Sequence, residues 1–146
     1  MNIRSHPRTR AAMVVLGCLA LGMTVAAAPI PTPLKGQFTG SGFTFSGNLS
    51  HLGLFTGQIT SFIPTETGGL TTATWTAANG DEVFVSSVFT VTGYDSSTGL
   101  FTFSQEITIG GGTGRFAGAS GEASAVGETA IDFSTYYGNI NGVIDY

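Results

Sequence analysis

A series of strand-like runs, separated by turn-forming residues, constrains this fold more than any other feature of the sequence. Threonine, serine, glycine, valine, isoleucine and phenylalanine dominate from residue 35 onward, and these residues suit pleated strands and tight turns. No capped run places apolar residues at every third or fourth position, as an amphipathic helix requires. We therefore predict an all-β protein, a single antiparallel β-barrel of about eight strands that is closed or nearly closed.

The predicted strands cover residues 35–45, 52–62, 70–77, 82–92, 100–109, 117–126, 130–133 and 139–146. The clearest alternation lies in 100–109, where four apolar residues share one face: Phe101, Phe103, Ile107 and Ile109. Gly40 and Gly42 predict a bulge or bend in the first strand, which would switch the residues that face inward. A hairpin through residues 134–138 would join the last two strands.

Asn79-Gly80 is the strongest hairpin signal in the chain. It lies between two strand-like runs, and a two-residue turn needs positive φ at both positions, which Asn and Gly accept. Asn79, Asp81 and Glu82 could also hold a weak calcium ion at the hairpin tip. Turn chemistry alone explains these residue types, however, and we predict no metal site.

The first 28 residues have the order of a secretory signal peptide. A basic start precedes an apolar run over residues 11–25, and three alanines follow at 26–28. Pro29 disfavours cleavage directly before it, so we expect cleavage after residue 26 or 27. The sequence thus predicts export to the periplasm or the extracellular space.

Two alternatives exist for the same segment. A retained membrane anchor would use the apolar run, which is short for a span of ~20 residues. A lipoprotein would use Cys18 and the preceding Val15-Leu16-Gly17, although the apolar run continues beyond that cysteine.

Residues 29–34 are predicted to be an extended, proline-rich leader, and residues 35–146 the barrel.

Removal of the signal peptide changes the chemistry that the chain can perform. It takes away the only cysteine, so the mature protein has neither a disulfide nor a thiol nucleophile. Lys35 and Arg115 are the basic residues that remain, against nine acidic residues. This balance argues against nucleic acid and anionic membrane surfaces as partners, because both need basic patches.

A glycine-rich turn, GGTGRFAGASG, spans residues 111–121. Its motif residues are Gly111, Gly112, Gly114, Arg115, Phe116 and Gly121. We predict positive φ at Gly112 and Gly114, because glycine accepts it and allows close backbone approach. Phe116 is expected to fold back as an apolar plug over one barrel mouth, and Arg115 to pair with a nearby acid or carbonyl.

This turn resembles the signature in the last third of dirigent proteins and, more loosely, of allene oxide cyclases. The resemblance implies a small antiparallel barrel and a homotrimer. The acidic and aromatic cavity residues of those families have no matching positions here, so it implies no activity. The chain also resembles small secreted bacterial proteins that share HLGxFT and AANGD stretches, here residues 51–56 and 77–81.

Catalytic and cofactor motifs are weak. His51 is the only histidine after the signal peptide, and its neighbour Ser50 would point to the opposite face of a strand. A nucleophile elbow is also missing from the sequence. Gly112-x-Gly114-x-x-Ala117, with Asp132 further on, fits the dinucleotide fingerprint, but that motif needs a helix where we predict a strand. We therefore predict no catalytic residue and no cofactor.

The expected function is non-catalytic binding of a small apolar or aromatic molecule in the barrel mouth. One alternative is a structural or interaction protein at the cell surface, and another is an isomerase of the allene oxide cyclase type. A third is a small outer-membrane barrel, because the last strand ends on an aromatic residue. Ile140 and Ile144 share the parity of Tyr136 and Tyr146 and would face lipid in that case, whereas we expect them to face inward.

Overall fold

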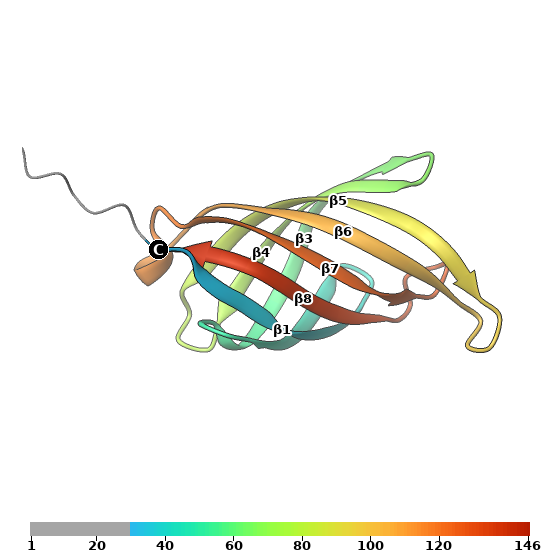
Figure 1. The fold of residues 1–146 in the computed structure, drawn as a ribbon, viewed down its shortest axis with the longest axis horizontal. Coiled ribbons are helices and arrows are strands. Elements are labelled where there is room, and N and C mark those ends of the chain that lie inside the picture. The colour runs from blue at the N-terminus through green and yellow to red at the C-terminus, as the bar shows by residue number, and fades with distance from the viewer. Residues whose placement is uncertain (1–29) are drawn as a thin grey trace, which may run out of the picture.

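Eight antiparallel strands close into a barrel in the computed structural model, which describes residues 30–146 (Figure 1). The elements are β1 (Thr32–Ser41), β2 (Thr44–Leu49), β3 (Gly53–Thr65), β4 (Gly68–Ala77), β5 (Glu82–Asp95), β6 (Leu100–Gly112), the short 3₁₀-helix η1 (Gly114–Phe116), β7 (Ser120–Thr129) and β8 (Tyr136–Asp145). Each strand pairs with the next, and β1 pairs with β8. The predicted fold class is therefore confirmed. The predicted signal peptide and Cys18 lie outside the described residues.

The first predicted strand is two strands joined by a tight hairpin. Ser41 pairs with Thr44, so the loop holds only Gly42 and Phe43. Gly42 has a φ of +57°, which a two-residue loop with glycine at its first central position uses to match the strand twist. The predicted bend at Gly40 and Gly42 is thus a complete reversal. Strand β1 also begins at Thr32, so part of the predicted leader is strand.

The register irregularities lie elsewhere than predicted. One falls between Ile59 and Ser61 in β3. Two more fall in the pairing of β5 with β6, between Val83 and Val85 and between Val91 and Gly93. The irregularity in β3 changes which alternate residues of the strand face inward. Phe62, which pairs with the buried Thr71, therefore lines the interior, as Ile59 does before the irregularity.

Residues 130–133, predicted as a strand, form the β7–β8 turn instead. The backbone N–H of Ala130 donates to the carbonyl of Thr135 at 2.9 Å, and that of Phe133 donates to Ala130 at 3.0 Å. Asp132 stabilises the turn by accepting the backbone N–H of Ser134 at 3.0 Å. The predicted total of eight strands still agrees with the structure. The predicted strand at 35–45 covers two observed strands, and the predicted strand at 130–133 corresponds to none.

The two ends of the barrel differ. The closed end carries the turns at 50–52 and 78–81, η1 and the end of β8 near the C-terminus (Figure 1). The open end carries the turns at 42–43, 66–67, 96–99 and 130–135, and the β3–β4 and β5–β6 hairpins extend from it. Because β2 has only 6 residues and β3 has 13, the β1–β2 turn stops short and leaves the open end slanted.

The interior is solid near the closed end. Six large side chains there are fully buried: Leu34, Leu49, Leu52, Val83, Phe116 and Ile144. Ile140 and Ile144 face inward as expected, and the outward positions of β8 include Asn139, Asn141 and Asp145. Among residues 30–146, no helix has the length and hydrophobicity to cross a membrane.

Candidate functional site

A cavity of about 280 Å³ occupies the half of the barrel next to the open end. Aromatic side chains form most of its wall, among them Phe38, Phe45, Trp75, Phe89, Phe103 and Phe133. Inward-facing residues of this half, such as Val85 and Phe89, keep an exposed fraction of 7–8%, whereas Leu34 and Phe116 in the closed half keep none. The eleven phenylalanines of the chain therefore do not fill the barrel.

The aromatic rings form tilted and edge-to-face pairs rather than filling the space. Phe89 and Phe103 have ring centroids 5.1 Å apart, and Phe38 and Phe45 have centroids 6.1 Å apart. Such pairs prefer tilted geometries that present both ring faces and ring edges to a neighbour. The wall thus suits a flat apolar or aromatic ligand.

Three of the polar side chains in the wall lie on the neighbouring strands β4, β5 and β6, and the buried Thr129 of β7 also lines the cavity. Thr71 on β4 is paired in register with Ser87 on β5, and their hydroxyls are hydrogen-bonded. The Gln105 Nε2 of β6 donates to the Ser87 Oγ at 2.6 Å. All three line the cavity, and Thr71 and Ser87 are more than nine-tenths buried. We call these three residues the polar row.

Sequence reasoning missed the polar row. Gln105 lies on the inward parity of β6 between Phe103 and Ile107, and Ser87 lies between Val85 and Phe89 on β5. The available signal was a single polar residue among the apolar, inward-facing residues of each strand. It did not reveal that Thr71 on a third strand is level with Ser87, or that Gln105, which is level with Phe89, reaches Ser87, because only the strand register brings these residues together.

Phe133 stands at the mouth of the cavity. Its ring lies edge-on to Phe62 and to Phe89, with centroids 5.9 and 5.8 Å away. Its φ is +55°, a conformation that bulky residues adopt rarely and at a cost. Its carbonyl accepts the backbone N–H of Gly42 at 2.8 Å, which ties the β7–β8 turn to the β1–β2 turn across the opening.

Tyr136 and Asp132 are the ionisable residues that line the cavity. Tyr136 donates to the carbonyl of Thr44 at 2.9 Å, and burial raises the pKa of its hydroxyl to about 12. Asp132 is exposed at the mouth, and hydrogen bonds from the side chain and backbone of Ser134 lower the pKa of its carboxyl below 3.8. Neither group changes its charge near neutral pH.

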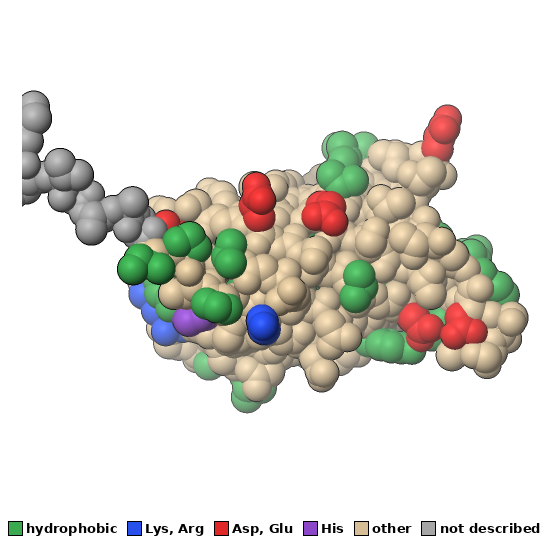
Figure 2. All heavy atoms as spheres, in the orientation of Figure 1, with side chains coloured by type: hydrophobic (Ala, Val, Ile, Leu, Met, Phe, Trp, Pro, Cys, Tyr) green, Lys and Arg blue, Asp and Glu red, His purple; other side chains and the backbone are tan. Residues whose placement is uncertain are grey.

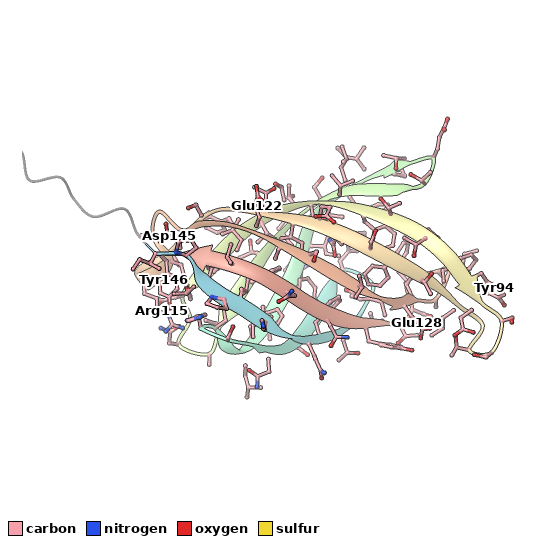
Figure 3. The ribbon with its side chains drawn as sticks, viewed as in Figure 1. Tyr94, Arg115, Glu122, Glu128, Asp145 and Tyr146 are labelled. Atoms are coloured by element: carbon pink, nitrogen blue, oxygen red, sulfur yellow. The ribbon has the colours of Figure 1, made fainter. Side chains whose placement is uncertain are left out.

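Charge is distributed unevenly between the two ends. Glu66, Asp95, Glu128 and Asp132 lie in or next to the turns of the open end. Figure 3 places Tyr94 and Glu128 toward that end, opposite Arg115 and Tyr146. In Figure 2, the blue and purple side chains on the visible face lie toward the C-terminus, whereas red ones lie along the whole length of the barrel, including the far hairpins. The cavity mouth is thus acidic, and among residues 30–146 no basic side chain lines the cavity.

The glycine-rich motif lies at the closed end. Gly111 and Gly114 have φ values of +130° and +56°. Gly112 does not have a positive φ, so that prediction was wrong. Glycine is needed there because a Cβ would collide with the carbonyl of Glu82 and with Phe116. Gly121 of β7 pairs with Ile144 of β8, and a Cβ at this position would collide with the carbonyl of Val143.

Phe116 and Arg115 seal the closed end. Phe116 has no exposed surface, and the Arg115 guanidinium lies 4.7 Å from the centroid of its ring. Arg115 also donates to the carbonyl of His51, and its Nε lies 3.8 Å from the Asp81 carboxylate. The motif therefore has packing and hydrogen-bonding contacts, and none of its residues lines the cavity.

Asn79 and Gly80 lie in the β4–β5 loop next to this motif. Gly80 has a φ of +88°, but Asn79 does not have a positive φ, because the connection between Ala77 and Glu82 is longer than a two-residue turn. Asn79 Nδ2 donates to the Asp81 carboxylate at 2.8 Å. The Asp81 carboxylate also pairs with Arg115. The oxygens that a calcium ion would need are therefore already engaged by polar neighbours.

His51 lies at the closed end, away from the cavity. Its Nε2 lies 3.1 Å from the carbonyl of Pro33, and its Nδ1 lies 3.0 Å from the hydroxyl of Tyr146. Ser50 bonds to Pro33 and to the backbone of Lys35 rather than to His51.

Residues 30–146 hold no group of three or more potential metal-ligating side chains. The helix that a dinucleotide would need is also missing, because η1 has three residues and β7 follows.

No protein-family model matches this chain, and no curated protein or solved structure matches it significantly. The fold and the cavity are therefore the basis for any functional proposal.

Proposed function

We propose that this chain is an exported, non-catalytic binding protein that holds one small apolar or aromatic molecule inside its barrel. The observation that carries the proposal is the aromatic cavity of about 280 Å³ behind the open end. Small barrels either fill with side chains or hold one small ligand, and this interior is solid at one end and hollow at the other. Mostly apolar walls with a few polar groups are typical of ligand sites.

The ionisable groups of the cavity support binding rather than turnover. An efficient general acid or base has a pKa close to the working pH. Asp132 stays ionised because its pKa is lowered, and Tyr136 stays protonated because its pKa is raised to about 12. His51, the only histidine among residues 30–146, lies at the other end of the barrel.

A neutral fluorescent probe tests the proposal. The naphthylamine probe 6-propionyl-2-(dimethylamino)naphthalene has two fused rings and gains fluorescence in apolar surroundings. Trp75, the only tryptophan, lines the cavity and reports the same event by energy transfer. We expect saturable binding of one probe per chain, with loss of Trp75 emission. Failure of both signals at probe concentrations up to its solubility would contradict the proposal.

A pair of variants on one strand separates the cavity from the outer surface. Ala73→Phe places a ring in the cavity and should weaken probe binding at least about tenfold, because the volume is no longer free. Thr72→Phe adds the same ring to the exposed outer face and should leave binding unchanged. Thermal melting of both variants checks that the barrel is intact. Equal loss of binding in both folded variants would place the probe outside the barrel.

A further inference from the structure

The polar row offers a ligand one specific acceptor. Gln105 uses its Nε2 to donate to Ser87, and its Oε1 receives no hydrogen bond from the described residues. Among those residues, no side-chain polar atom that lacks a partner is closed off from water, so the Gln105 Oε1 is reachable. Because Gln105 has the inward parity of Phe103 and Ile107, this oxygen is reachable through the cavity.

The neighbouring bonds fix this acceptor in place. The Thr71 and Ser87 hydroxyls bond to each other, and the Ser87 Oγ accepts from Gln105. An amide held through one end presents its other end in one direction, as ligand sites with preorganised polar groups do. A ligand that covers this acceptor without donating to it loses affinity, because the acceptor has given up its hydrogen bond to water. A ligand that donates to the acceptor replaces that hydrogen bond.

The shape and the charge of the cavity restrict the ligand further. A volume of about 280 Å³ is at the lower end of ligand pockets, which typically run from ~300 Å³ upward. This space suits one or two fused rings. Asp132 at the mouth and the nearby acids Glu128 and Asp95 repel an anion, and no Lys or Arg of the described part of the chain lies along the wall to receive it.

We propose that the cavity selects an uncharged aromatic molecule of one or two rings that carries a hydrogen-bond donor, such as a heteroaromatic N–H, and that Gln105 is the residue that selects the donor. This inference rests on the proposed function and deepens it. The rings would lie among Phe89, Phe103 and Trp75, with the donor directed to the Gln105 Oε1.

Two bicyclic molecules of the same shape test the role of Gln105. Indole has an N–H where benzofuran has an oxygen, so only indole donates. By calorimetry, we expect the native protein to bind indole at least about tenfold more tightly than benzofuran, the change expected for one buried hydrogen bond. Gln105→Met keeps the length of the side chain and removes its acceptor. In this variant the preference should fall below about threefold, with benzofuran affinity unchanged.

The outcomes distinguish the two levels of the proposal. If neither molecule nor the naphthylamine probe binds, the proposed function fails. If both bicyclic molecules bind equally well to the native protein, or Gln105→Met keeps the preference for indole, only the role of Gln105 fails. Should Gln105→Met not fold, Ser87→Ala replaces it, because loss of the Ser87 hydroxyl releases the Gln105 amide and should also reduce the preference.

A second pair tests the charge selection. Indole-2-carboxamide and indole-2-carboxylate have nearly the same shape, but the carboxylate is an anion at neutral pH. We expect the carboxylate to bind at least about tenfold more weakly, and Asp132→Asn with Glu128→Gln to reduce that difference. Equal affinities for the two molecules in the native protein would overturn the charge selection.

Discussion

The Asp81 carboxylate accepts a hydrogen bond from the backbone N–H of Arg115 at 3.2 Å, across 34 positions of sequence. The Arg115 side chain in turn donates to the carbonyl of His51. These bonds join the β4–β5 loop, the β6–β7 connection and the β2–β3 turn at one end of the barrel. Phe116 lies buried beneath them. The closed end is thus held by contacts between turns, and the cavity lies in the other half.

Gly114 makes the contact between Asp81 and Arg115 sterically feasible. Its φ is +56°, and a Cβ at this position would collide with the Asp81 carboxylate. We predict that Gly114→Ala lowers the free energy of unfolding by about 1–3 kcal/mol, through backbone strain and through loss of the Asp81 contacts. Urea denaturation measures this change.

Gly118 provides the matched control. Its φ is +80°, but a Cβ there would meet no atom within 4 Å. Gly118→Ala should therefore show only the cost of the backbone conformation, which is smaller. In an Asp81→Ala background, the cost of Gly114→Ala should fall to that of Gly118→Ala. An unchanged cost in that background would mean that the Asp81 side chain is not the cause.

His51 should be dispensable for binding. The residue lies at the closed end, where its ring bonds to Pro33 and to Tyr146. We predict that His51→Ala lowers stability by about 1 kcal/mol through loss of these bonds. The affinity for the naphthylamine probe should stay within about threefold, because the cavity binds through apolar area. A substrate whose conversion collapsed in this variant would instead make His51 a general base.

Phe133 should limit the rate at which a ligand enters. Its ring packs between Phe62 and Phe89 at the mouth, and its φ of +55° suits glycine better than phenylalanine. We predict that Phe133→Gly raises both the association rate and the dissociation rate of the probe on the order of tenfold. Stopped-flow fluorescence measures both rates. Phe133→Leu retains an apolar side chain at the mouth, so rates as fast as those of the glycine variant would argue against a steric role.

Tyr136 should make stability fall at alkaline pH. Burial raises the pKa of its hydroxyl to about 12 in the folded state, against 10.0 for an unperturbed tyrosine. A raised folded-state pKa gives a stabilisation that is complete below pH 10 and is lost as the pH rises toward 12. We predict that this fall, on the order of 1–2 kcal/mol, is smaller in Tyr136→Phe. Parallel curves for the two proteins would show that another group causes it.

Export remains a prediction from residues 1–28, which lie outside the described part of the chain. Mass spectrometry of the exported protein should find an N-terminus at residue 27 or 28, because cleavage is expected after residue 26 or 27. Replacing the basic start by neutral residues should reduce export. A membrane-embedded protein that still begins at Met1 would contradict this prediction.

Local sequence alone determined the fold class. Alternation with a period of two is a property of neighbouring residues, so the strand at 100–109 and the inward parity of Ile140 and Ile144 could be predicted. Glycine was harder to interpret, because its freedom serves both a bulge and a reversal. The Gly42-Phe43 hairpin is an example, since a bend would have left one strand where the structure has two.

Only the tertiary structure determined the site. The polar row joins Thr71, Ser87 and Gln105 from three strands, and their proximity depends on strand register rather than on sequence spacing. Whether the barrel is hollow depends on the difference between its enclosed volume and the volume of its side chains. That difference is set when β1 meets β8 and the barrel closes, because closure fixes the diameter that the aromatic side chains must fill.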